Sequence, residues 1–349
     1  MPDDAFNPRR FFLKVAASTG LSALGPSGSA HAFMGASRKY EWLPSECADT
    51  RYPMQLISGQ LLGGNDLIAH VPAGKIINNG WGKIGSRRLE GPEQKAVPDR
   101  LDLAWFSYAE DKFYGGSVPL PHALLMQLFA EGFEVPLAQE RDTWQKILVG
   151  MGLGGWTSVW LAGASLVREV AIARVEPVSL AWSRVLDNPA IERADFVRST
   201  LMNRLGKEAF EALMRNGPPV SSWPRYAQRE RWRPAVAGNA VPQHISVGGF
   251  NGERLFHDFT RSPPGVFEPI PRDAQITYLS PSGSRLMAVI SFDEAEMFGA
   301  FDQARKTGAA PMTLRFEMEA RSRVAITLEG ATGRIALQRS RVQIGSVTR

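Results

Sequence analysis

The sequence predicts an α+β fold made of two related, mostly antiparallel β-sheet units, each with one covering helix, joined by a helical linker. The two halves can be aligned weakly, with residues 53–59 on 242–248 and residues 98–105 on 271–278. The offset stays at 173 residues (98 to 271) as far as Leu128 and then becomes 167 (147 to 314). A single length change of this kind fits a surface loop. Both halves also follow the order strand, hairpin, strand, helix and three-strand meander.

The first unit is expected over residues 40–177. Its helix is predicted over residues 121–131, because Pro121 suits a first helical position and Gly132 suits a helix end. The apolar residues between them fall on one helical face. Strands are predicted where apolar runs are bounded by turn residues, at residues 54–60, 66–71, 101–108, 112–118, 146–151, 157–161 and 167–175.

The linker is expected over residues 178–240. Apolar residues recur there at helical spacing with charges between them, which predicts two or three helices. Its last part, residues 223–233, is rich in arginine and aromatic residues.

The second unit is expected over residues 241–349. Its helix is predicted over residues 293–306, with Asp293 as the N-cap and Glu296 completing a capping-box-like pair. Its strands are predicted at residues 244–249, 275–279, 285–292, 312–319, 323–328, 334–338 and 341–345.

The bulk composition fits two ordinary globular domains, since 349 residues with 44% hydrophobic content can build two cores. The net charge is +5 without a dense Lys/Arg stripe, so we expect no nucleic-acid partner. The single cysteine, Cys47, excludes an intrachain disulfide and a cysteine-based zinc site, and an unpaired thiol is more often buried than reactive. The histidines show no metal-ligand spacing, so no metal is expected. No cofactor is expected either, because the glycine-rich residues 150–155 lie between two predicted strands, as in a hairpin turn.

Residues 1–32 resemble a twin-arginine export signal. Arg9 and Arg10 precede Phe-Phe-Leu-Lys, an apolar run follows, and Ala30 and Ala32 form a small-x-small cleavage site. The apolar run is shorter than the roughly 20 residues of a membrane span. We therefore expect a periplasmic mature chain without a transmembrane helix. The alternative is an ordinary amphipathic N-terminus.

The densest cluster of functional side chains is residues 105–114. Glu110 and Asp111 could pair as acid and base, but adjacent side chains on a strand point to opposite faces. A hairpin with its tip at residues 109–111 and its aromatic residues in the core is the favoured interpretation. His122 could act as a base, although a solvated histidine at a helix start is the simpler interpretation. No catalytic residue is assigned.

The candidate partner-binding residues are aromatic and arginine side chains. Trp156 and Trp160 would face one side of a strand and could form a surface patch, although core packing is the favoured interpretation. The second group consists of Arg225, Tyr226, Arg229 and Trp232. It could bind an anion or an acidic partner, although a solvated linker with structural stacking on the aromatic rings is the favoured interpretation.

Several short motifs together resemble a domain-of-unknown-function family of bacterial envelope proteins (domain of unknown function 2931). They are residues 100–114, 120–121, 128–129, 149–150, 154–155 and 159–163, with Tyr52-Pro53, Gly132 and Asn251-Gly252-Glu253. The resemblance implies predicted lipoproteins, some of them encoded near type six secretion components and phospholipase effectors. It therefore implies an immunity or accessory binding role and no catalytic residues. This chain departs from the pattern because no lipoprotein motif precedes Cys47.

The sequence leads us to expect an exported, non-enzymatic binding protein whose partner is a secreted effector. One alternative is a periplasmic protein that binds a small ligand or glycan in the cleft between the units, using the aromatic residues Trp156, Trp160, Tyr226 and Trp232. The other is a hydrolase of unrecognised type.

Overall fold

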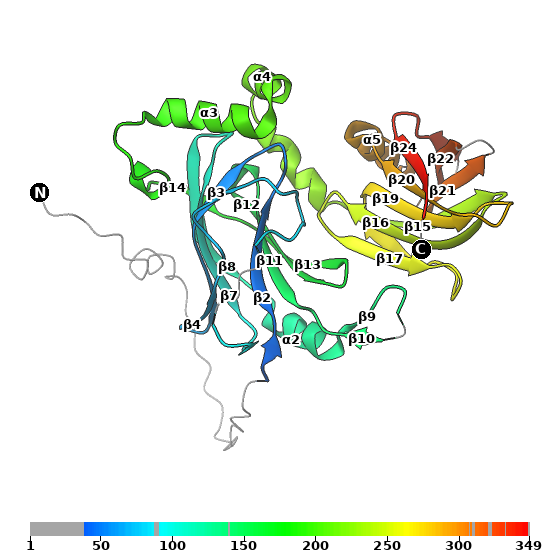
Figure 1. Ribbon diagram of the computed structural model, residues 1–349, viewed down its shortest axis with the longest axis horizontal. Helices are drawn as coiled ribbons and strands as arrows, with labels where there is room; N and C mark the ends of the chain where they lie inside the picture. Colours follow the sequence, from blue (N-terminus) through cyan, green and yellow to red (C-terminus); the bar gives the residue numbers. More distant parts are fainter. Residues whose placement is uncertain are drawn as a thin grey trace, which may run out of the picture.

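The computed structural model describes residues 38–86, 91–138, 140–306, 308, 311–319, 323–331 and 333–347. The predicted export signal, with Arg9, Arg10, Ala30 and Ala32, lies outside these residues. The described residues form two β-rich units side by side, with a group of helices above the first unit and leading to the second (Figure 1). The predicted α+β fold with mostly antiparallel pairing is confirmed.

The first unit contains two facing sheets. One follows the order β14-β8-β7-β3-β4, and its strands are β3 (Met54–Gly63), β4 (Asp66–His70), β7 (Arg100–Ser107), β8 (Lys112–Pro119) and β14 (Glu176–Val178), with the short β5 (Ile76–Ile77) beside β3. The other contains β2 (Leu43–Ala48), β11 (Lys146–Met151), β12 (Trp156–Gly163) and β13 (Leu166–Arg174). Helix α2 (His122–Glu131) follows β8 and buries Leu125, Leu128 and Phe129, as its apolar spacing predicts.

The second unit repeats this arrangement. One sheet contains β16 (Val241–Gly249), β17 (Arg254–Asp258), β19 (Pro271–Leu279), β20 (Arg285–Ser291) and β24 (Arg341–Ser346). The other contains β15 (Arg229–Gly238), β18 (Phe267–Pro269), β21 (Met312–Glu319), β22 (Arg323–Gly330) and β23 (Gly333–Ala336). Helix α5 (Glu294–Arg305) begins after the predicted N-cap, since the Asp293 carboxylate accepts a hydrogen bond from the backbone N–H of Glu296.

The strand-pairing order is the same in both units. Strands β3, β7 and β8 pair in the same antiparallel series as β16, β19 and β20. The strand that opens each unit pairs in parallel, β2 with β11 and β15 with β21. The ladders also agree in register, because Val149 lies opposite Val159 and Phe316 lies opposite Ile326.

The two units share one nine-stranded sheet, in the order β2-β11-β12-β13-β17-β16-β19-β20-β24. The join between β13 and β17 consists of a single residue pair, Val167 and Arg254. Backbone pairing therefore contributes little to holding the units together, and side-chain contacts at the junction must supply most of the cohesion.

The linker is helical, as predicted, but shorter. It contains two 3₁₀ helices, η3 (Trp182–Arg184) and η4 (Val220–Ala227), and two α-helices, α3 (Arg193–Leu205) and α4 (Lys207–Asn216). The predicted extension of the linker to residue 240 is wrong. Strand β15 begins at Arg229 and supplies the parallel partner of β21 in the second unit.

Several strands escaped prediction. Strand β2 lies in the segment Leu-Pro-Ser-Glu-Cys-Ala, which has no polar–apolar alternation because it is buried on both faces. The other missed strands of the first unit are only two or three residues long, and they are β1 (Tyr40–Glu41), β5, β6 (Gln94–Lys95), β9 (Phe133–Glu134), β10 (Arg141–Asp142) and β14.

The aromatic hairpin lies in the core, as predicted. The aromatic side chains that flank its turn are all at most 5% exposed, namely Trp105, Phe106, Tyr108, Phe113 and Tyr114. Within the described part of the chain, no helix combines the length and the apolar character needed to cross a bilayer.

Candidate functional site

The junction between the units is filled by a continuous chain of aromatic rings. Successive ring centroids lie 5.0 to 5.9 Å apart, and the chain runs through Trp160, Trp81, Trp223, Tyr226, Phe250 and Phe298. The first two rings belong to the first unit, the next two to η4 and the last two to the second unit. Each such pair stabilises the junction by about 0.5–1.5 kcal/mol beyond its burial.

The backbones of the two units also meet directly. Gly82 has a φ of +74°, and a Cβ atom there would lie 2.1 Å from the carbonyl oxygen of Gly252. Beside this contact, the indole Nε1 of Trp160 donates a 3.1 Å hydrogen bond to the carbonyl oxygen of Asn251. Only glycine fits at residue 82, because the position needs both a left-handed conformation and a close approach.

A buried carboxylate pair lies at the same junction. The side chains of Glu169 in β13 and Glu253 next to β17 are only 4% and 6% exposed. Arg229 reaches Glu253 at 3.0 Å and Glu169 at 3.3 Å, and the Asn251 amide donates to both carboxylates. Burial, and next the charge of Glu253, raise the pKa of Glu169 to about 7, although Arg229 opposes the shift.

A cavity of about 290 Å³ opens at the junction; we call it the junction cavity. Its apolar wall contains Trp81, Phe250 and Phe292, and its polar wall includes Arg51 and Glu294. The first unit, η4 and the second unit all contribute lining residues, so the cavity exists only in the assembled chain.

Arg51 organises one side of the junction cavity. Its guanidinium donates two hydrogen bonds to Asp49, at 2.9 and 3.0 Å, and a third to Glu294 at 3.0 Å. The Tyr226 hydroxyl donates to Glu294 at 2.7 Å and lies 3.0 Å from Arg51. Burial raises the pKa of Tyr226 above its ordinary value, so the hydroxyl stays protonated and keeps donating.

Asp273 occupies the opposite side of the junction cavity. Arg254 donates to it at 2.6 Å and Arg272 at 3.2 Å. Burial alone would raise the pKa of Asp273, but these two arginines lower it below its ordinary value. The carboxylate is therefore ionised and compensated within the fold.

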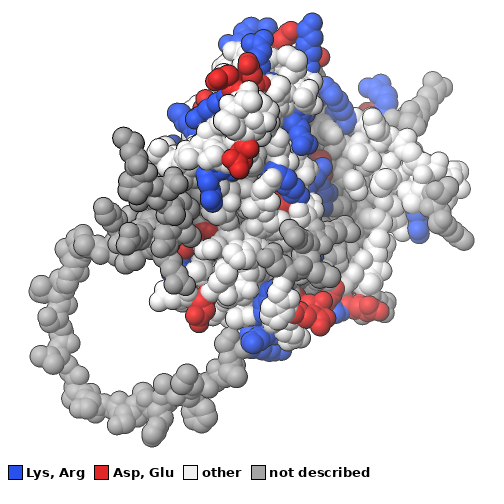
Figure 2. Space-filling view, turned by 60° about the vertical axis from the view of Figure 1, so that its left-hand side comes forward, with Lys and Arg blue, Asp and Glu red and all other residues white. Residues whose placement is uncertain are grey.

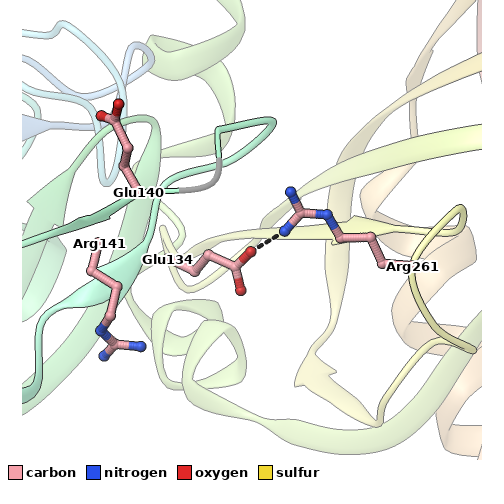
Figure 3. A pocket seen from close by; sticks show the side chains of 4 residues that line it. All are labelled: Glu134, Glu140, Arg141 and Arg261. Atoms are coloured by element: carbon pink, nitrogen blue, oxygen red, sulfur yellow. Dashed lines mark hydrogen bonds and ion pairs between the residues drawn. The ribbon is translucent and has the colours of Figure 1, made fainter.

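A groove runs between the β9–β10 hairpin and the loop after β17; we call it the hairpin groove. Figure 3 shows Glu134 pointing across it to Arg261, with which it forms an ion pair, while Glu140 and Arg141 extend away along the hairpin. Cavities of about 360 and 210 Å³ adjoin this ion pair. Leu137, at the hairpin tip, is 62% exposed and has a φ of +64°.

One side of the hairpin groove is an unpaired strand edge. The backbone N–H of Phe259 donates to Gln243 of β16, so alternate residues of β17 face β16. Phe256 therefore directs its backbone N–H and carbonyl groups to the other side, where β13 pairs only with Arg254, whereas the Asp258 carbonyl oxygen accepts a hydrogen bond from the backbone N–H of Arg261. The side chains of Phe256 and Leu166 line the groove next to this edge.

The candidate partner-binding residues do not form one surface. Trp160 and Trp232 are fully buried in different places, and Trp232 donates to the carbonyl oxygen of Pro269 at 2.9 Å. Trp156 is partly buried against the core. The predicted surface patch of Trp156 and Trp160 is therefore wrong. A glycan cleft built from these side chains also loses its basis, because Trp160 and Trp232 are fully buried in different places and do not line a shared cavity.

The remaining candidates have structural contacts. Arg225 stacks over the Phe298 ring at 4.6 Å and pairs with Asp302 at 3.1 Å. Arg229 is engaged by the buried carboxylate pair. Among the candidates, only Tyr226 lines the junction cavity.

The possible acid–base groups are also engaged by the fold. Glu110 accepts hydrogen bonds from Ser107 at 2.8 Å, Tyr114 at 2.7 Å and the Gly154 backbone at 3.1 Å. Asp111 pairs with Arg193 of α3 at 2.8 Å. This part of the hairpin therefore fastens the glycine-rich turn and the linker to the first unit.

The described residues contain neither a cluster of metal ligands nor an accessible thiol. No three His, Cys, Asp or Glu side chains are grouped as metal ligands there. Cys47 is fully buried, as expected for an unpaired thiol, and burial raises its pKa to about 12. A protonated, inaccessible thiol is a poor nucleophile.

Comparison with known families assigns the chain. The family model described as "Protein of unknown function (DUF2931)" matches residues 28–214. The chain belongs to the DUF2931 family. The match spans the first unit and most of the linker, and it ends before the second unit. No curated protein and no solved structure matches the chain.

Sequence analysis missed the residues that shape both surfaces. Arg51, Lys83 and Arg272 lie at turns or strand ends far apart in sequence, and no local pattern brings them together. The hairpin groove carried one usable signal, since the segment Val135-Pro136-Leu137 places apolar residues in a loop.

Proposed function

We propose that this DUF2931 member is an exported, non-enzymatic binding protein whose partner is a protein, such as a secreted effector. The observation that carries the proposal is the hairpin groove, where an unpaired strand edge lies beside an exposed leucine. Backbone groups at such an edge can hydrogen-bond an extended segment, and apolar side chains beside it can select its residues. The segment would add to β17 at Phe256, whose backbone groups face away from β16.

The state of the ionisable groups supports binding rather than catalysis. Catalytic groups need access to a substrate and a partner that sets their protonation. In the described chain, Glu110, Glu169 and Glu253 are held by hydrogen bonds and arginine contacts inside the fold, and the exposed Asp111 is paired with Arg193. Figure 2 shows basic and acidic side chains interspersed on the visible face, which favours a mixed protein surface over a nucleic-acid footprint.

We further propose that the chain arose by duplication and that it is located in the periplasm. The shared pairing order of the two units supports descent from a duplicated sheet-and-helix module. The twin-arginine-like residues Arg9 and Arg10 support export of the folded chain to the periplasm.

Site-specific photocrosslinking tests the proposed function. The producing cells are grown together with neighbouring cells that deliver effectors. A photoreactive amino acid at Leu137 is then expected to crosslink the chain to a polypeptide. The matched control is Met214, which is 52% exposed on α4 and distant from the hairpin groove in sequence and fold. Crosslinks at Leu137 but not at Met214 support the proposal. Equal crosslinking at both positions, or none at either, contradicts it.

A further inference from the structure

We infer that the junction cavity is a binding site for a single carboxylate group attached to an apolar body. Lys83 and Arg272 would hold the carboxylate, and the rings of Trp81, Phe250 and Phe292 would contact the body. This site is separate from the hairpin groove and does not depend on a partner binding there.

One of the three cations that line the junction cavity forms no ion pair with the described residues. Asp49 and Glu294 are satisfied by Arg51, and Asp273 is satisfied by Arg254 and Arg272. Lys83 also lines the cavity, yet its ammonium has no ion-pair partner among the described residues. A lysine ammonium supplies three donors, so an anion can be recognised here without breaking any ion pair of the fold.

The Lys83 side chain lines the junction cavity and is exposed to solvent. A Cβ atom at Gly80, another lining residue, would lie 2.8 Å from the Cδ atom of Lys83, so the lysine stem packs on that turn. Arg272 lies on the same side. Its Nε and Nη1 groups donate to Asp273 and to the Trp81 carbonyl oxygen, and its Nη2 group has no hydrogen-bond partner among the described residues.

The cavity walls define the class of ligand. A volume of about 290 Å³ lies at the small end of the roughly 300–1,000 Å³ typical of small-molecule sites. Asp49 and Glu294 on the facing wall would repel an anion carrying several charges. Trp81, Phe250 and Phe292 are each at most 8% exposed and offer a largely apolar surface. One carboxylate with an apolar body satisfies all three conditions, either as a free small acid or as an acidic side chain of a polypeptide.

Isothermal titration calorimetry on the full mature chain tests the inference. The probes are 3-phenylpropionate and its neutral analogue 3-phenylpropanamide, with a blocked Ala-Glu-Ala peptide and its Ala-Gln-Ala counterpart as the second pair. Wild-type protein is expected to bind at least one acid with one-to-one stoichiometry and at least tenfold more tightly than its neutral counterpart. Tighter binding of phenylpropionate identifies free acids as the ligand source, and tighter binding of the glutamyl peptide identifies an acidic side chain.

Substitutions at Lys83 tie the binding to the cavity. Lys83→Met is expected to weaken acid binding at least tenfold, whereas Lys83→Arg, which keeps the charge, retains most of it. Lys207→Met is the matched control, because Lys207 is 85% exposed on α4 and does not line the cavity. Unchanged affinity in Lys83→Met, equal affinity for acid and neutral probes, or no binding of either acid by wild-type protein overturns the inference. Crosslinking at Leu137 reports on the hairpin groove alone, so either proposal can fail while the other stands.

Discussion

Replacing Glu169 by glutamine is expected to remove a pH-dependent loss of stability at the junction. The Glu169 carboxylate is 4% exposed and lies beside the Glu253 carboxylate, with one arginine, Arg229, between them and solvent. Glutamine has nearly the same shape as protonated glutamate and carries no charge. The substitution therefore keeps the packing and removes the cost of a buried second negative charge.

The sign and size of the effect come from the pKa of Glu169. Burial raises this pKa to about 7 in the folded chain, against 4.5 for an ordinary glutamate. A raised folded-state pKa gives stability that is fully present below pH 4.5 and is lost as the pH rises through 7. One pKa unit corresponds to about 1.4 kcal/mol, so Glu169 should cost wild-type protein about 2–3 kcal/mol between pH 5 and pH 8. Glu169→Gln should not show this loss.

The assay is urea unfolding of both proteins at pH 5 and pH 8. The difference in free energy of unfolding between Glu169→Gln and wild type is expected to rise by about 2–3 kcal/mol over this interval. Glu268→Gln is the matched control, because Glu268 also approaches Arg229, at 3.9 Å, but is 54% exposed. Its effect should stay within about 0.5 kcal/mol at both pH values. A mutant-to-wild-type difference that is constant with pH, or that falls, would refute the assigned role of the buried pair.

Three further changes test other parts of the structure. Gly82→Ala should lower the free energy of unfolding by about 3 kcal/mol in urea titrations, since it adds a clash to backbone strain. Gly64→Ala, which has a positive φ but open space around it, should cost only about 1 kcal/mol, and equal losses would contradict the junction packing. Asp293→Ala should remove the N-cap of α5 and lower the thermal midpoint through a loss of about 1 kcal/mol; an unchanged midpoint would argue against that cap. Conversion of Arg9 and Arg10 to lysine should retain the chain in the cytoplasm, and continued export in cell fractionation would disprove the twin-arginine route.

Periodic features of the fold could be predicted because they depend on neighbouring residues. The offset of 167 residues placed Val149 on Phe316 and Val159 on Ile326, and the structure pairs each set in the same register. The Asp293 cap was predictable for the same reason, since its partner lies three residues away.

Of the two parallel strands, β2 could not be found in this way. Strand β2 pairs with a segment 103 residues away (43 to 146), and its Pro, Ser and Glu residues give no strand signal. Strand β15 did carry a signal, because Arg229, Arg231 and Arg233 alternate with buried Trp232 and Pro234. The helical spacing upstream of residue 229 does not continue into this strand.

The candidate site depended on information that a single sequence does not contain. Trp81 contacts Trp160 and Trp223, which belong to a distant strand and to the linker. Their burial follows from how the two units pack, whereas a tryptophan on a strand is equally compatible with a core or a surface position. The packing of the two units also determines that Trp160 and Trp232 are buried. It likewise determines that Arg51 and Lys83 line the junction cavity.

The seam between β13 and β17 joins unlike positions of the two units, so it is a head-to-tail contact. In the pairing order, β4 of the first unit corresponds to β17, and β23 of the second unit corresponds to β13. Both are sheet edges without a partner strand in the described chain. A head-to-tail contact does not close on itself, so similar chains could polymerise through these two edges. Each edge is short, five residues in β4 and four in β23, and carries charge at Asp66 or Arg334. Short, charged edge strands disfavour pairing with a second chain, so they oppose the growth of such fibres.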